Sequence, residues 1–97
     1  MSINAYRMKG NNLDSEVASF DVWHDKKFME FLDEEIQFYM ILNSFSTGIV
    51  DVPVDLLEKA VHWQENLDLD DDTIEQINLD VEYAKSNKDK VVTYYCF

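Results

Sequence analysis

The sequence predicts an α+β fold: a small antiparallel sheet (an N-terminal hairpin plus a C-terminal strand) with about three helices packed on one face. Segments rich in β-branched and aromatic residues lie at both ends of the chain, and the middle places apolar residues at a helical period. The 97 residues include 46% hydrophobic residues but only two Gly and one Pro, which leaves little room for a linker. We therefore expect residues 1–97 to form a single compact acidic domain.

The strands are expected from the two ends of the chain. Residues 2–9 (SINAYRMK) alternate imperfectly between apolar and polar side chains, and residues 10–12 (GNN) are typical of a turn. Residues 16–23 (EVASFDVW) would then form the second strand of the hairpin, with a short helix as the open alternative. Residues 90–97 (KVVTYYCF) predict the closing strand.

Two helices are expected to follow the hairpin. Asp25 is a suitable cap for a long helix over residues 26–43, and Gly48 lies just beyond its end. Pro53 suits the first turn of a second helix over residues 54–65, where its missing N–H has no helical partner to lose.

A third helix is expected over residues 72–86. Asp70 or Asp71 would cap its start, and Asn87 would end it. The predicted order of elements is therefore β-β-α-α-α-β.

Apolar side chains at a helical period assign each helix a core face. The expected core residues are Phe28, Phe31, Leu32, Tyr39 and Leu42, then Leu56, Leu57, Ala60 and Trp63, then Ile74, Ile77, Val81 and Ala84. On the first helix Glu30, Asp33, Glu34 and Gln37 form the opposite stripe. Glu35 breaks the pattern, because it projects among the apolar residues. It is expected to be a buried carboxylate that is satisfied by Arg7 or a tyrosine, or else one that performs a task.

Negative charge is concentrated in the middle of the chain. The net charge is −12, and residues 14–82 hold 19 acidic and three basic side chains. The remaining ends are weakly basic. Such a density of like charge destabilises a compact fold by self-repulsion, and a basic partner would offset that cost. Simple solubility is the alternative explanation.

The densest stretch is NLDLDDDTIEQINLDVE at residues 66–82. Asp70, Asp71 and Asp72 fall at a predicted helix N-terminus, where the helix dipole favours an anion by ~0.3–1 kcal/mol. This effect explains one or two carboxylates, but not three together with Asp68. The surplus is what requires a function.

A calcium loop does not fit this stretch. Aligning Asp68, Asp70 and Asp72 with the first ligands of an EF-hand loop puts Thr73 where Gly is needed and Leu79 where the bidentate Glu belongs. We expect no ordered calcium site here.

A transition-metal site is also not expected. Glu58, His62 and Glu65 share one helix face, and His24 neighbours Asp25, but no closing set of ligands accompanies them. Neither a metal nor a cofactor is predicted.

The residues needed for nucleophilic catalysis, for binding phosphate or nucleic acid, and for membrane insertion are also not found in the sequence. Cys96 lies alone in an apolar strand, which suits a packing role better than a nucleophile, and it permits no internal disulfide. The chain has no Gly-rich phosphate loop, no basic footprint for nucleic acid and no apolar run of ~20 residues, and its start does not resemble a signal peptide. We expect a non-enzymatic, monomeric protein of the cytoplasm that binds neither nucleic acid nor membranes directly.

The hypothesis that remains is that the protein binds a partner through its negative charge. Carboxylates three or four residues apart on a helix lie ~5–6 Å apart, close to the spacing of successive phosphates. Pairs of this kind are Glu30/Glu34, Asp55/Glu58 and Asp72/Glu75. The predicted partner-binding residues are Glu30, Asp33, Glu34, Asp55, Glu58, Asp68, Asp70, Asp71, Asp72, Glu75 and Glu82, with Leu79 and Tyr83 as apolar anchors opposite the core face.

In charge and size the chain resembles the small acidic DNA mimics encoded by phages, including anti-restriction and anti-CRISPR proteins. The resemblance covers residues 14–82 and carries no motif. It implies an inhibitor that blocks the basic DNA-binding channel of a host defence complex, whose partner would be a basic nucleic-acid-binding protein or complex in a bacterial cytoplasm.

Two further hypotheses remain from the sequence. The first is an immunity protein that caps the basic active-site cleft of a cognate nuclease toxin. The second is a regulatory or structural subunit that buries Leu79 and Tyr83 in an assembly. A neighbouring toxin gene would favour the first of these over a DNA mimic.

Overall fold

A computed structural model describes residues 3–9, 12–14, 17–42 and 47–97. These residues form five strands and four helices: β1 (Asn4–Lys9), β2 (Asn12–Leu13), β3 (Phe20–Asp21), α1 (Lys26–Ile36), α2 (Phe38–Ile41), β4 (Gly48–Pro53), α3 (Val54–His62), α4 (Asp71–Ser86) and β5 (Val91–Cys96). All strand pairs are antiparallel, so the α+β class expected from the sequence is confirmed. Within these ranges no helix has the length and apolar character needed to cross a membrane.

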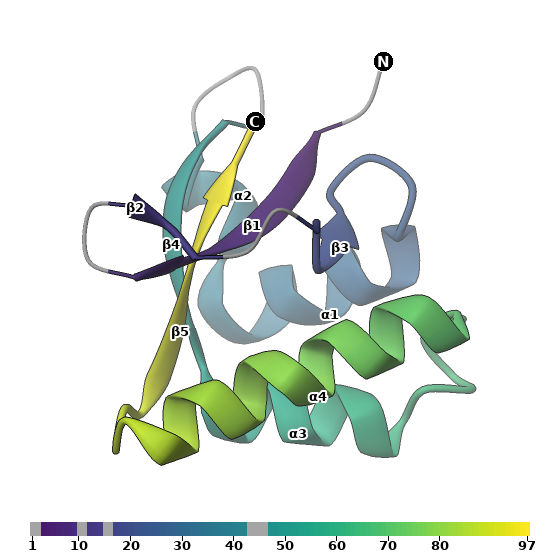
Figure 1. The fold of residues 1–97 in the computed structure, drawn as a ribbon. Coiled ribbons are helices and arrows are strands. Elements are labelled where there is room, and N and C mark those ends of the chain that lie inside the picture. Colours follow the sequence, from purple (N-terminus) through teal and green to yellow (C-terminus); the bar gives the residue numbers. More distant parts are fainter. Residues whose placement is uncertain (1–2, 10–11, 15–16, 43–46) are drawn as a thin grey trace.

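The C-terminal strand β5 lies in the middle of the sheet. The strand order is β2-β1-β5-β4, and β3 pairs with the other end of β1. Tyr94 of β5 is buried between its neighbours, as are Val50 and Val52 of β4, while Tyr95 and Ile49 are exposed. One face of the sheet is therefore covered, and Figure 1 shows α1, α3 and α4 gathered on that side.

The strand β4 was not predicted. Residues 44–53 were interpreted as a connection because Gly48 was taken to follow a helix, whereas Gly48 begins a strand with φ 144°. Val50 and Val52 alternate with exposed Ile49 and Asp51, which is the period of a strand buried on one face. Residues 43–46, and with them Asn43 at the end of the predicted helix, lie outside the described residues.

The prediction of a strand over residues 16–23 was mostly wrong. Of the described residues in this range, only Phe20 and Asp21 pair with β1, and the hairpin partner of β1 is β2 instead. The strand ends because the carboxylate of Asp21 accepts the backbone N–H groups of Trp23 and His24, which closes a turn. Residues 1–2, 10–11 and 15–16, which include most of the predicted GNN turn, lie outside the described residues.

The long helix predicted over residues 26–43 is broken at Gln37. Gln37 has φ 54°, and its N–H donates to Asp33 O. The carboxylate of Asp33 then accepts the N–H of Tyr39 at 3.0 Å, which satisfies one free donor at the start of α2. The break buries Phe38 and leaves Tyr39 44% exposed, so the prediction of Tyr39 as a core residue was wrong.

The second helix is shorter than predicted. It ends at His62 rather than near residue 65, and Trp63 is 41% exposed instead of lying in the core. The chain turns here because Leu67 and Leu69 are both buried after the turn, and a continuing helix would carry them away from the core. The expected burial of Leu56, Leu57 and Ala60 is confirmed.

The third predicted helix is confirmed as α4. Its N-cap is Asp70, whose side chain accepts the N–H of Thr73 at 2.7 Å. Asp25 also stands at the N-cap position of α1, but its carboxylate accepts the N–H of Asp21 and makes no capping bond.

The face that α4 turns to the core is rotated from the prediction. Ile77, Val81 and Ala84 are buried as expected, but Ile74 is only half-buried. On the other flank Asp80 is fully buried, and Tyr83, predicted to be opposite the core, is half-buried. This rotation buries Asp80 in the core and leaves Ile74 at its edge.

The buried carboxylate is Asp80, and the prediction for Glu35 was wrong. Glu35 is exposed, and its Oε1 lies 3.8 Å from Nζ of Lys59. The partners expected for Glu35, Arg7 and a tyrosine, bind Asp80 instead.

Three donors satisfy the Asp80 carboxylate. Arg7 Nη1 donates to Oδ1 at 2.8 Å, while the hydroxyls of Ser19 and Tyr94 donate to Oδ2 at 2.5 and 2.7 Å. Removal from water raises the pKa of Asp80, and these bonds offset that effect in part. Arg7 also pairs with Asp14 at 2.9 Å. The network therefore fastens α4 to β1, to β5 and to the segment before β3.

Candidate functional site

The acidic residues predicted to bind a partner reach the surface of the helix layer. Asp33 is half-buried, and the others are exposed, namely Glu30, Glu34, Asp55, Glu58, Asp68, Asp70, Asp71, Asp72, Glu75 and Glu82. They lie on α1, on α3, and on α4 with the turn before it, so the helices form the acidic side of the molecule. On the sheet, Asp51 of β4 is exposed, and its carboxylate accepts a hydrogen bond from Thr93.

The starts of α1 and α4 together form a second acidic feature. A cleft of about 320 Å³ between them is lined by Asp21, Asp25, Asp70 and Asp72. Burial raises the pKa of Asp25, and the negative charges of Asp70 and Asp21 raise it further. Asp21 and Asp25 were not predicted as partner-binding residues, because nothing local indicates that Asp25 approaches a segment 45 residues later.

The cluster at the start of α4 divides into two roles. The N–H of Thr73 lowers the pKa of Asp70, as expected for a capping carboxylate that must stay ionised. Asp71 and Asp72 are exposed in the first turn and make no such capping bond. Asp70 therefore stabilises the helix, while Asp71 and Asp72 are available to a partner.

Two predicted contact residues already hold cations of the chain itself. Glu58 pairs with Lys85 at 3.1 Å, and Asp68 pairs with Lys27 at 2.9 Å. All four side chains are well exposed, and such pairs contribute about 0–1 kcal/mol. A denser array of cations on a partner could exchange with them at small cost.

The two predicted apolar anchors differ in exposure. Leu79 is 47% exposed, as expected. The ring of Tyr83 instead lies under the guanidinium of Arg7, which stands 4.5 Å from the ring centroid. Tyr83 belongs to the contact between α4 and β1, so the prediction that it lies opposite the core face was wrong, while its role in partner binding stays a prediction.

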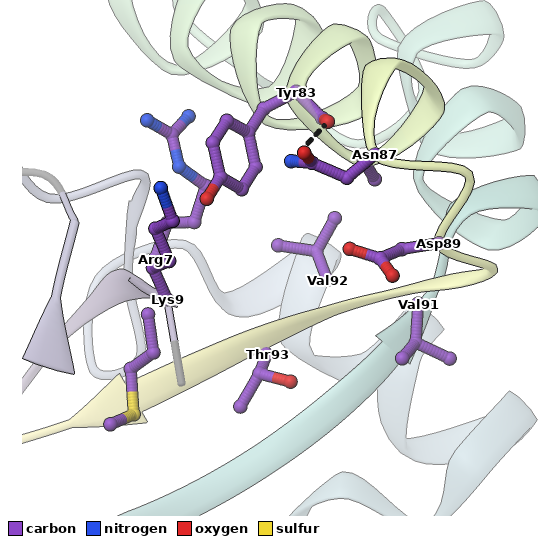
Figure 2. A pocket seen from close by; sticks show the side chains of 10 residues that line it. Arg7, Lys9, Tyr83, Asn87, Asp89, Val91, Val92 and Thr93 are labelled. Atoms are coloured by element: carbon purple, nitrogen blue, oxygen red, sulfur yellow. Dashed lines mark hydrogen bonds between the residues drawn. The ribbon is translucent and has the colours of Figure 1, made fainter. Parts of the chain in front are cut away.

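Tyr83 lines a separate cleft of about 300 Å³ between the end of α4 and the strands β1 and β5. Figure 2 shows Arg7 and Lys9 on one side of this cleft and Asn87 and Asp89 on the other. Asn87 donates its amide to the carbonyl of Tyr83 and so closes the last turn of α4.

Several of the basic residues lie at this same end of the molecule, whereas Lys26, Lys27 and Lys59 lie on α1 and α3. Lys85 lies in the last turn of α4, Lys88 and Lys90 lie in the connection to β5, and Lys9 ends β1 beside them. Cations are favoured at a helix C-terminus by the dipole. The molecule is thus polarised along α4, acidic at its start and basic at its end.

Residues that could hold a metal or act as a nucleophile do not converge. In the described ranges no three His, Cys, Asp or Glu side chains are arranged to hold a metal ion. Cys96 is buried, which raises the pKa of its thiol to about 12. A thiol with this pKa is protonated at neutral pH and unreactive.

Comparison with known proteins adds no constraint. The chain matches no protein-family model, no curated protein and no solved structure.

Proposed function

We propose that the protein inhibits a nucleic-acid-handling host defence complex by presenting the charge of DNA and occupying the complex's basic DNA-binding channel. The observation that carries the proposal is the arrangement of the carboxylates. They project outward from three helices that share one core, so the charge sits on a preorganised body rather than on a flexible tail. Such a surface presents its charge without a large ordering cost on binding.

The dimensions of α4 suit this role. A helix of 16 residues is about 24 Å long, close to the length of seven base pairs. Asp71, Asp72, Glu75 and Glu82 are exposed along it. The acidic cleft at its start offers a place for a lysine or arginine that would otherwise bind a phosphate.

The polarity of the molecule supports a defined orientation. The acidic end would enter a positively charged channel, and the basic end at Lys9, Lys85, Lys88 and Lys90 would face outward. Long-range steering by such a charge distribution accelerates association with a basic partner. In this proposal the protein acts as a monomer in the cytoplasm of a bacterial host.

The proposal is tested by comparing two charge-removal variants that each lose two carboxylates. The first is Asp71→Asn with Glu75→Gln on the proposed interface, and the second is Asp51→Asn with Asp89→Asn away from it. Binding of each to a purified CRISPR effector complex and to a purified type I restriction enzyme is measured by biolayer interferometry. The first variant should weaken binding at least tenfold more than the second.

Equal effects of the two variants would mean that only net charge matters, and the proposed interface would be wrong. Binding to neither complex, together with tight binding to a small nuclease domain, would replace this proposal by the immunity-protein hypothesis.

A further inference from the structure

Two large aromatic side chains stand exposed beside the acidic stripe of α1. Trp23 is 39% exposed and Tyr39 is 44% exposed. Together with Val22, Lys26 and Glu30 they line a cleft of about 360 Å³. We call this cleft, lined by these five residues, the aromatic slot.

The chain holds Tyr39 in this position at a cost. Gln37 adopts a left-handed conformation that is unfavourable for a residue with a Cβ, and the resulting break turns Tyr39 away from the core. Met40 and Ile41 are turned outward with it, at 79% and 48% exposure. Contiguous exposed apolar residues, rimmed by polar ones, mark interaction sites.

A second site on this protein has two aromatic rings and a carboxylate that already hold a lysine. On the other flank of α1 the rings of Phe31 and Trp63 meet edge to face at 5.9 Å. Nζ of Lys59 stands 4.7 Å from the Trp63 ring centroid and 5.9 Å from that of Phe31. Glu35 lies 3.8 Å from the same ammonium. Two rings and a carboxylate therefore hold a cationic side chain.

The aromatic slot has the same kinds of side chain, but the cation that lines it, Lys26, is held by neither the rings nor the carboxylate in the described ranges. Trp23 and Tyr39 provide the rings, and Glu30 provides the carboxylate. In the part of the chain that the structure describes, no cation stands over either ring, and Lys26 makes no ion pair. The negative charges nearby are real neighbours of the ring, since burial and then Asp33 and Glu30 raise the pKa of Tyr39.

We propose that the aromatic slot binds a basic side chain, preferably arginine, of the partner protein. The source of that side chain rests on the proposed function, because a DNA-binding channel is lined with arginine and lysine. A guanidinium stacks flat on an aromatic face and still donates hydrogen bonds to a carboxylate at its edge, which an ammonium does less well. Lys26 lines the same cleft, and we expect its ammonium to compete with the arginine for Glu30.

The slot is tested with a defined probe, a hexa-arginine peptide, and a control peptide in which citrulline replaces arginine. Binding is followed by NMR through the indole N–H resonances of Trp23 and Trp63. We expect the arginine peptide to shift the Trp23 resonance and to leave that of Trp63 unchanged, because Lys59 already occupies the second site. The citrulline peptide should shift neither resonance.

Matched variants separate the slot from general acidity. Glu30→Gln and Glu34→Gln remove the same charge one turn apart on α1, but only Glu30 lines the slot. Glu30→Gln and Tyr39→Leu should each raise the Kd of the arginine peptide about twofold to fivefold, as a cation–π contact or an exposed charge pair predicts. Glu34→Gln should change it less than twofold, and Lys26→Met should lower it.

Equal losses of affinity for the arginine peptide in Glu30→Gln and Glu34→Gln would show that the slot does not bind arginine. An unchanged Kd in Tyr39→Leu would show the same. These outcomes are independent of DNA. If the slot binds arginine but the protein does not exclude DNA from a defence complex, the proposed function fails and the slot stands. If DNA is excluded but Trp23 does not respond to the arginine peptide, the reverse holds.

Discussion

Replacing Asp80 with Ala should be among the most destabilising single changes on α4. The carboxylate is fully buried and accepts three hydrogen bonds, from Arg7, Ser19 and Tyr94. Arg7 keeps its pairing with Asp14, but the two hydroxyls are left without their acceptor. Breaking a buried charged network by removing one member costs about 3–5 kcal/mol.

This loss is large for a domain of this size. A domain of 60–100 residues loses about 4–8 °C in melting temperature per kcal/mol, so the variant should melt about 12–40 °C below the wild type. Asp71→Ala on the same helix is the matched control. It removes an exposed first-turn carboxylate, which contributes about 0.3–1 kcal/mol.

Thermal and urea unfolding, followed by circular dichroism, provide the assay. Tyr94→Phe should cost about 1–2 kcal/mol, since it removes one donor and leaves the other two. The double variant of Asp80 and Tyr94 should lose less than the sum of the single losses, because the two residues share one bond. A loss in Asp80→Ala no larger than that in Asp71→Ala would refute the buried network.

Three further predictions concern helix geometry. Asp70→Ala should lower the unfolding free energy by about 1 kcal/mol at pH 7, because the cap is lost. The folded pKa of Asp70 lies below the ordinary 3.8, so the contribution of the cap is present above that pH and is lost as the pH falls through the folded value. The difference in unfolding free energy between variant and wild type should therefore shrink in acid. Ile77→Asp should unfold the chain by burying an unpaired charge, while Leu79→Asp, two residues away and exposed, should leave its circular dichroism unchanged. Gln37→Gly should raise the unfolding free energy by up to about 1 kcal/mol in urea titrations, because Gly adopts the left-handed conformation without strain. A loss of stability would mean that the Gln37 side chain makes a compensating contact.

Local patterns predicted much of this fold correctly. The terminal strands, the start of α3 after Pro53 and the cap of α4 at Asp70 all follow from residues within a few positions of the feature. The strand β4 carried its own signal in the alternation around Val50, but Gly48 was interpreted as a helix terminator and hid it.

Features set by distant contacts were missed. Nothing near Gln37 requires a break, since it is neither Gly nor Pro, and the gain comes from burying Phe38 in the core. The burial of Asp80 was not predicted, because its partner Arg7 lies 73 residues away in the sequence. The same limit applies to the acidic cleft, where the fold brings Asp25 to Asp70.

The central claim, that the protein takes the place of DNA, is tested most directly by competition. A fluorescently labelled target duplex is bound to a purified CRISPR effector complex, or to a purified type I restriction enzyme, and the protein is titrated in while anisotropy is recorded. The wild-type protein should displace the duplex fully, and its association should slow as salt rises because screening at ~8 Å weakens long-range attraction. A ternary complex, in which the saturating protein binds while the duplex stays in its channel, would contradict it.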